Sequence, residues 1–190
     1  MGSINLAIDT EPLVTETVDT LVSKLDPTLY YHSPAHTKDV LRQTLELAEA
    51  DALDDRDVLL LAIAAAFHDA GFLKQRPKNE PIGAKMAIEA MAKSGRFSQE
   101  ECDLVEQMIL DTQLVMDGPA QIANSRLSPW LLDADLANLG RDDFWDQTKL
   151  LAKELNIDLP NMLPMTQALM QRHDWKSPAG QRLFGAKKES

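Results

Sequence analysis

The 190-residue sequence predicts a single all-α domain. Three observations support this fold class. Apolar residues recur at spacings of three and four, which is the period of an amphipathic helix. Serine or aspartate stands where these patterns begin, often followed by proline, and glycine closes several of them. No segment alternates apolar and polar residues over the length of a strand.

Residues with known positional preferences mark the helix ends. Ser33, Ser128 and Ser177 each precede a proline, which is the pattern of an N-cap followed by proline in the first turn. The segment Ser98–Glu101 reads as a capping box, and Gly71 closes the most apolar helix. In chain order we expect helices at 10–25, 34–50, 55–69, 82–95, 102–113, 130–140, 142–156, 163–173 and 179–189.

The chain reads as one domain over 1–190, with a core at about 30–140 and C-terminal helices at 141–190 packing on it. The net charge of −11 and the pI of about 4.7 predict an acidic surface, so we expect neither nucleic acid nor a membrane as a partner. A single cysteine, Cys102, excludes an intrachain disulfide. With no signal peptide expected at the N-terminus, the prediction is a cytoplasmic protein.

The third predicted helix ends in an unexpected way. Its apolar run leads into "AAFHDAGF", so His68 and Asp69 follow a helix that is expected to be buried. Burial of a charged group without a partner is costly. A divalent cation would compensate that cost, and imidazole with carboxylate is a donor set that suits such an ion. Further donors stand on other predicted helices: His36 on the second, and Asp133 and Asp135 on the sixth.

Three segments, "YYHSPAHTKDVL", "HDAGF" and "LLDADLANLG", resemble in this order the HD superfamily of metal-dependent phosphohydrolases. The resemblance implies an all-α HD-type domain with His36, His68, Asp69 and Asp135 as metal ligands. Asp133 competes with Asp135, but residues two apart do not share a helix face, so only one should reach the metal. The flank "Asp135-Leu-Ala" is more similar to the family pattern, and Asp135 is therefore the expected ligand.

The chain departs from members of the superfamily that bind two metals, which carry extra histidines before the distal aspartate. No histidine lies between His68 and His173. We therefore expect one divalent ion, without a preference among Mn, Fe, Co, Ni, Zn and Mg, and we do not expect a di-iron oxygenase. His173 is interpreted as a structural residue that packs beside Trp175.

We expect three residues to take part in catalysis: His32, Glu80 and Asp69, the last of which is also an expected metal ligand. "YHSPAH" resembles an element of the cyclic-nucleotide phosphodiesterase branch, which implies that His32 is a general acid. Glu80 either orients water or relays a proton, or simply favours the first turn of its helix through the dipole. The basic run Lys74, Arg76 and Lys78 is either a phosphate-binding loop or a solvated charged loop.

These residues predict hydrolysis of a phosphate ester of a nucleotide or other small phosphorylated metabolite by a metal-activated water. A cyclic-nucleotide phosphodiesterase is one alternative. A non-catalytic metal- or nucleotide-binding signalling module with the same fold is another. Surface-active helices at both ends of the chain could support a homodimer. Trp130 and Trp145 are expected to lie in the core.

Overall fold

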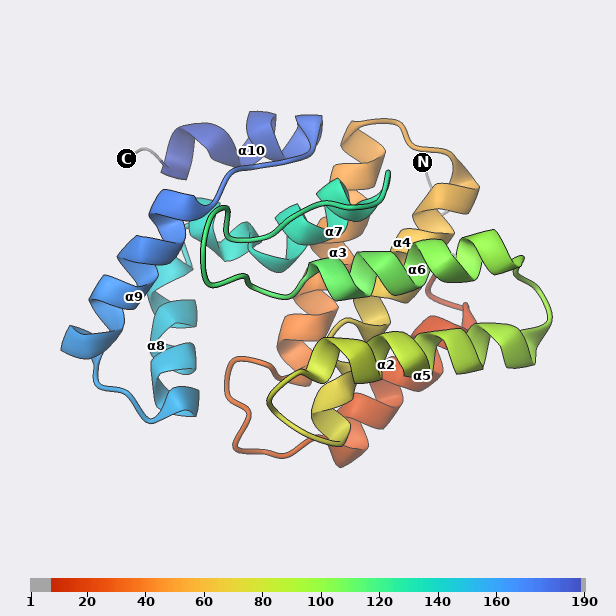
Figure 1. The fold of residues 1–190 in the computed structure, drawn as a ribbon, viewed down its shortest axis with the longest axis horizontal. Coiled ribbons are helices and arrows are strands. Elements are labelled where there is room, and N and C mark those ends of the chain that lie inside the picture. Colours follow the sequence, from red (N-terminus) through yellow and green to blue (C-terminus); the bar gives the residue numbers. More distant parts are fainter. Residues whose placement is uncertain (1–7, 189–190) are drawn as a thin grey trace.

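The computed structural model describes residues 8–188, and this part of the chain contains helices and no strand, which confirms the predicted all-α class (Figure 1). The N-terminal segment for which no signal peptide is expected lies largely outside the described residues. The helices are α2 (Pro12–Lys24), α3 (Pro34–Ala50), α4 (Asp55–Phe67), α5 (Asn79–Ser94), α6 (Gln99–Asp111), α7 (Ser128–Asp135), α8 (Phe144–Leu155), α9 (Leu159–Arg172) and α10 (Pro178–Lys188), with 3₁₀ turns η1 (Ala70–Leu73) and η2 (Ala137–Gly140).

Several helix starts are capped as the sequence predicts. The Ser33 side chain accepts a hydrogen bond from the backbone N–H of His36, with Pro34 in the first turn of α3. Ser98 and Glu101 form the predicted capping box at the start of α6. These bonds satisfy backbone donors that the first turn of a helix leaves without partners. The cap at Ser33 thus binds the backbone N–H of His36 and places this residue in the first turn of α3.

Helix α4 is the centre of the bundle. Every residue from Leu60 to Phe67 is buried, and α2, α3, α5, α6 and α7 all pack around the helix. A helix that is apolar on all sides has no face suited to water, so burial on all sides is its stable arrangement. Its C-terminal end carries His68 and Asp69 inside the protein, at 1% and 7% exposure.

Two glycines allow α5 to approach the end of α4 very closely. A Cβ atom at Gly83 would lie 2.6 Å from the carbonyl oxygen of Phe67 and 3.3 Å from that of His68. A Cβ atom at Gly71 would lie 1.9 Å from the carbonyl oxygen of Asn79. No larger residue fits at either position without moving backbone. The close contact therefore holds the segment after α4 against α5.

The C-terminal helices pack in two different ways. Helix α10 contacts α3, α7 and η2, whereas α8 packs mainly against α9 and η2 (Figure 1). The α8–α9 pair, which we call the C-terminal hairpin (144–172), lies at one side of the molecule and leaves large apolar side chains exposed. Trp145 is 54% exposed, so its prediction as a core residue is wrong, whereas Trp130 is half-buried and packs on the core.

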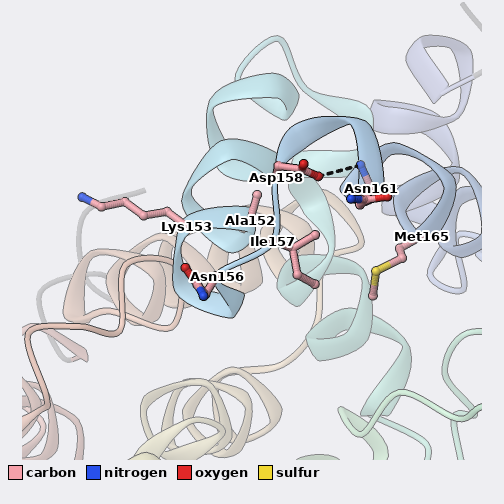
Figure 2. Close-up of a pocket in the computed structure, with 7 residues that line it drawn as sticks. All are labelled: Ala152, Lys153, Asn156, Ile157, Asp158, Asn161 and Met165. Carbon is pink, nitrogen blue, oxygen red and sulfur yellow. Dashed lines mark hydrogen bonds between the residues drawn. The ribbon is translucent and has the colours of Figure 1, made fainter.

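Two predicted helix boundaries are also wrong. Helix α9 begins at Leu159 and not at 163, because the Asp158 carboxylate accepts a hydrogen bond from the backbone N–H of Asn161 and caps the helix (Figure 2). Figure 2 shows that the groove between the end of α8 and the start of α9 is lined by residues of the C-terminal hairpin alone. The predicted helix at 130–140 is interrupted at Leu136, where α7 gives way to η2.

Among residues 8–188, no helix combines the length and the apolar character needed to cross a membrane.

Candidate metal centre

The four predicted ligands come from three helices and meet at one place. His36 lies in the first turn of α3, His68 and Asp69 follow α4, and Asp135 is the last residue of α7. His36, His68 and Asp69 each offer a ligand atom within 4.8 Å of the others. Asp135 Oδ1 lies 3.3 Å from His36 Nε2 and 3.7 Å from His68 Nε2. The structure thus brings together residues that are far apart in sequence.

The spacing of these atoms fits a small cation. His68 Nε2 lies 3.2 Å from Asp69 Oδ2, and His36 Nε2 lies 3.7 Å from the same oxygen. Ligands at about 2.1 Å from a tetrahedral ion stand about 3.4 Å from one another. The separations between the imidazole nitrogens and the carboxylate oxygens, 3.2–3.7 Å, are therefore close to those between neighbouring ligands of one ion.

The polar atoms that face one another are buried and have no hydrogen-bond partner. This holds for Nε2 of His36, Nε2 of His68 and Oδ2 of Asp69. A buried polar atom left without a partner costs about 1–3 kcal/mol. A divalent cation among these three atoms would satisfy all of them at once, so the donor set and its burial both fit a metal ion.

A hydrogen bond to the backbone holds the His68 ring so that Nε2 is the nitrogen that faces the other proposed ligands. Its Nδ1 lies 2.7 Å from the carbonyl oxygen of Ala65, an atom that can only accept a hydrogen bond. Nδ1 must therefore carry the proton, and in the neutral ring Nε2 presents its lone pair to the carboxylates. This arrangement, in which one ring nitrogen is held by a carbonyl, is the usual support of a metal-binding histidine.

Burial and charge act in opposite directions on the His68–Asp69 pair. Burial opposes protonation of His68, but the charge of Asp69, with a contribution from Asp135, outweighs it and raises the pKa of His68 to about 9. Burial likewise disfavours the ionised form of Asp69, but His68 outweighs it and holds the pKa of Asp69 well below its usual value. Protonated His68 and a bound cation are thus alternative ways to neutralise the negative charge of the Asp69 carboxylate.

The two aspartates of "LLDADL" point to different places. Asp133 is fully buried and accepts hydrogen bonds from the backbone N–H groups of Lys176 and Ser177 and from the Ser177 hydroxyl, at 2.6–2.8 Å for the shortest bond to each group. It therefore anchors the segment that leads into α10. Asp135 instead lies beside the histidines, and the two side chains diverge, as the argument from helix faces predicts.

His32 lies next to the predicted ligands but is held by a residue that the sequence analysis did not single out. Its ring stacks on Phe72 at 4.6 Å between centroids and lies 6.1 Å from the ring of His36. Its Nδ1 is 2.5 Å from Glu154 Oε1 on α8. The other oxygen of Glu154 accepts hydrogen bonds from the backbone N–H groups of Tyr31 and His32.

Glu154 also influences the charge of His32. Burial opposes protonation of the ring, but the hydrogen bond to Glu154 and the charge of Asp69 outweigh it and raise the pKa of His32 above its usual value. The hydrogen bond to Glu154 and the stacking on Phe72 therefore hold the His32 ring with Nδ1 toward Glu154. Nothing in the local sequence around Glu154 signals this role.

The remaining predicted site residues are less closely connected to the ligands. Glu80 lies in the first turn of α5, and its Oε2 is buried with no hydrogen-bond partner among residues 8–188. Lys74, Arg76 and Lys78 are exposed. Arg76 donates hydrogen bonds to Asp26 and to the Thr28 hydroxyl, so it ties its loop to the segment between α2 and α3. Of the three cations, Arg76 is therefore already engaged.

A pocket that the sequence analysis missed borders His36. Its volume is about 380 Å³, and it lies between the start of α3, the segment before it and α8. Two arginines line it, and Arg141 is held there by Asp39 and Asp143. The lining residues are Tyr30, Tyr31, Ser33, Ala35, His36, Asp39, Arg42, Arg141, Asp143, Gln147 and Leu150.

His173 behaves as a structural residue in the part of the chain that the structure describes. It is 2% exposed, and its ring packs edge-on against Trp175 at 4.4 Å between centroids. The sequence analysis predicts this contact.

Comparison of the chain with protein-family models, with curated proteins and with solved structures finds no match.

Proposed function

We propose that the protein is a metal-dependent phosphohydrolase that acts on a nucleotide or another small phosphorylated metabolite. One observation carries the proposal: His36, His68, Asp69 and Asp135 converge from three helices, and Nε2 of His36, Nε2 of His68 and Oδ2 of Asp69 are buried and have no hydrogen-bond partner. A mixed set of imidazole and carboxylate donors suits one divalent transition-metal ion. The resemblance of the same residues to the HD superfamily supports hydrolysis as the chemistry.

A bound divalent cation would supply a Lewis acid that activates water for attack at phosphorus. In the hydrolysis, the water oxygen forms a bond to phosphorus, the ester P–O bond breaks, and the leaving alkoxide takes up a proton. His32 is the proposed proton donor, because Glu154 holds its Nδ1 and favours its protonated form. Phe72 stacks against the same ring and restricts its rotation.

A cyclic-nucleotide phosphodiesterase is the more specific form of this proposal. The resemblance of "YHSPAH" to the cyclic-nucleotide phosphodiesterase branch supports it, and His32 would then protonate the ribose oxygen released when the cyclic phosphodiester opens. A non-catalytic metal- or nucleotide-binding module with the same ligands is the alternative from another class. In that case the four ligands would bind a cation, but His32 would have no proton to transfer.

Two measurements test the proposal together. Elemental analysis of the purified protein should find about one divalent transition metal per chain, and His68→Ala or Asp69→Ala should remove it. Activity is then screened on nucleoside monophosphates, cyclic nucleotides and an aryl phosphate ester with added Mn²⁺, Co²⁺, Ni²⁺, Zn²⁺ or Mg²⁺. Metal binding with no turnover across the panel would favour the non-catalytic module. Metal content unchanged in the ligand variants would overturn the site itself.

His32→Gln separates binding from catalysis. This variant should keep the metal, because His32 is not among the four proposed ligands, and should lose activity by about 100-fold or more, the usual contribution of a general acid.

A further inference from the structure

Gln121, in the segment between α6 and α7, has a buried side chain that contacts the candidate metal centre. Gln121 is 1% exposed, and its amide nitrogen donates hydrogen bonds to Asp135 Oδ2 at 3.0 Å and to the carbonyl oxygen of Thr112 at 2.8 Å. No feature of the local sequence pointed to Gln121. Gln121 contacts Oδ2 of Asp135, whereas Oδ1 of the same carboxylate faces the histidines.

The chemistry of its neighbours fixes the orientation of the Gln121 amide. A carboxylate and a backbone carbonyl can only accept hydrogen bonds, so the NH₂ group must face both of them. The Gln121 Oε1 is buried and has no partner among residues 8–188. The side chain is thus held by its two N–H bonds alone.

The hydrogen bond from Gln121 makes the two oxygens of Asp135 unequal. Oδ2 is engaged by the amide, whereas Oδ1 faces His36 Nε2 at 3.3 Å. A carboxylate held in this way can offer Oδ1 as a single ligand atom without rotating. Without the Gln121 amide, the Asp135 carboxylate could rotate about its Cβ–Cγ bond at a lower free-energy cost, and Oδ1 would be held less firmly toward His36.

The backbone that carries Gln121 is itself anchored to the end of α9. The Ala120 N–H donates to the carbonyl oxygen of Arg172 at 3.0 Å, and the Arg172 guanidinium donates to the carbonyl oxygens of Val115 and Met116 at 2.8 and 2.9 Å. The Val115 N–H in turn donates to the Ala120 carbonyl. These bonds fix the residue just before Gln121.

We propose that Gln121 is the positioning residue of Asp135 and that it sets the affinity of the centre for a divalent cation. This role rests on the metal centre of the proposed function, and it concerns a hydrogen bond that the ligand assignment alone does not require. Loss of a hydrogen bond to a ligating group typically weakens metal binding by 10–100-fold, and we expect a loss in this range.

The test compares metal binding by wild type, Gln121→Met and Gln43→Met, each freed of metal with a chelator. Methionine matches glutamine in length and makes neither N–H bond. Gln43 is the matched control, since it is also a buried glutamine, 4% exposed, but its amide donates to Glu46 on the same helix. Titration calorimetry with Mn²⁺ and Co²⁺ gives the dissociation constant, and the visible spectrum of bound Co²⁺ reports its coordination.

We expect Gln121→Met to bind Co²⁺ about 10–100-fold more weakly and with an altered spectrum, while Gln43→Met binds as wild type does. Equal affinity and an equal spectrum in Gln121→Met and wild type would overturn the positioning role and leave the metal centre standing. Failure of wild type to bind either ion would overturn the metal centre itself. If Gln121→Met does not fold, Gln121→Asn keeps the amide but is too short to reach Asp135, and the same criteria apply to it.

Discussion

His32 Nδ1 lies 2.5 Å from Glu154 Oε1, which joins the segment before α3 to α8. This contact predicts a specific effect of Glu154→Gln. The variant removes the negative charge that favours protonated His32, so the pKa of His32 should fall. A general acid works only while protonated, so the alkaline limb of the pH–kcat profile should move to lower pH.

Metal content is the control for this variant, because Glu154 contacts His32 and not the four proposed ligands. The interpretation fails if Glu154→Gln leaves the pH–kcat profile in place, or if it removes the metal.

The two neighbouring aspartates on α7 should give opposite results. Asp135→Ala removes a proposed ligand and should abolish stoichiometric metal binding. In the metal-free protein it breaks one of the two hydrogen bonds of the Gln121 amide, which keeps its bond to the Thr112 carbonyl, so it should destabilise the protein less than Asp133→Ala does. Asp133→Ala removes the acceptor for Lys176 and Ser177, which leaves buried donors unpaired, and should destabilise the protein by about 2–3 kcal/mol. Denaturant unfolding and elemental analysis of both variants distinguish these outcomes, and an exchange of the two phenotypes would refute the assignment of Asp135.

The His68–Asp69 pair predicts how stability depends on pH without metal. The folded-state pKa of His68 is raised from 6.5 to about 9, so its contribution is complete below pH 6.5 and is lost as the pH rises through about 9. The folded-state pKa of Asp69 is lowered, so its contribution is present above about pH 4 and is lost in acid. The metal-free protein should therefore lose stability between pH 6.5 and 9.

A bound cation should reverse this trend, because it requires the neutral form of His68. The melting temperature with excess Zn²⁺ or Mn²⁺, minus that with a chelator, should widen as the pH rises from 6.5 to 9. A difference that stays constant over this range would show that His68 does not exchange a proton for the ion.

The close approach of α5 to α4 predicts the effect of Gly83→Ala. The added methyl would lie 2.6 Å from the carbonyl oxygen of Phe67, which is backbone and cannot rotate away. We expect a loss of about 1–3 kcal/mol in the free energy of unfolding, as for other overpacked sites. Gly185→Ala on α10 is the control, since nothing lies within 4 Å of its added Cβ, and it should be neutral or slightly stabilising.

Unfolding of both glycine variants is measured in denaturant. Equal stability of Gly83→Ala and wild type would mean that α5 can move away from α4 at little cost.

The sequence predicts those parts of the protein that local patterns determine. The all-α class follows from apolar spacing, and the caps at Ser33 and Ser98 follow from short motifs. Helix geometry indicates that only one of Asp133 and Asp135 reaches the histidines, because two residues that are two positions apart point in different directions; the choice of Asp135 comes from its flank, which resembles the family pattern. The structure shows the reason for the pair: each aspartate satisfies a different set of partners.

Other parts depend on single contacts between distant segments, which leave no local pattern. Glu154 and Gln121 each reach the candidate site through hydrogen bonds from helices or loops far along the chain. The break at Leu136 and the early start of α9 arise from the packing of short segments and from an aspartate cap. The exposure of Trp145 reflects how little of the C-terminal hairpin packs on the core.

The peripheral position of the C-terminal hairpin has a kinetic consequence. Segments with few buried contacts exchange their amide hydrogens through local opening, at a lower free energy than global unfolding requires. Glu154 belongs to such a segment, whereas His68 and Asp69 follow the most enclosed helix of the bundle. On gentle warming, the amides of α8 should exchange before those of α4. His32, the proposed proton donor, should then lose its contact with Glu154 while the four proposed ligands still hold their places.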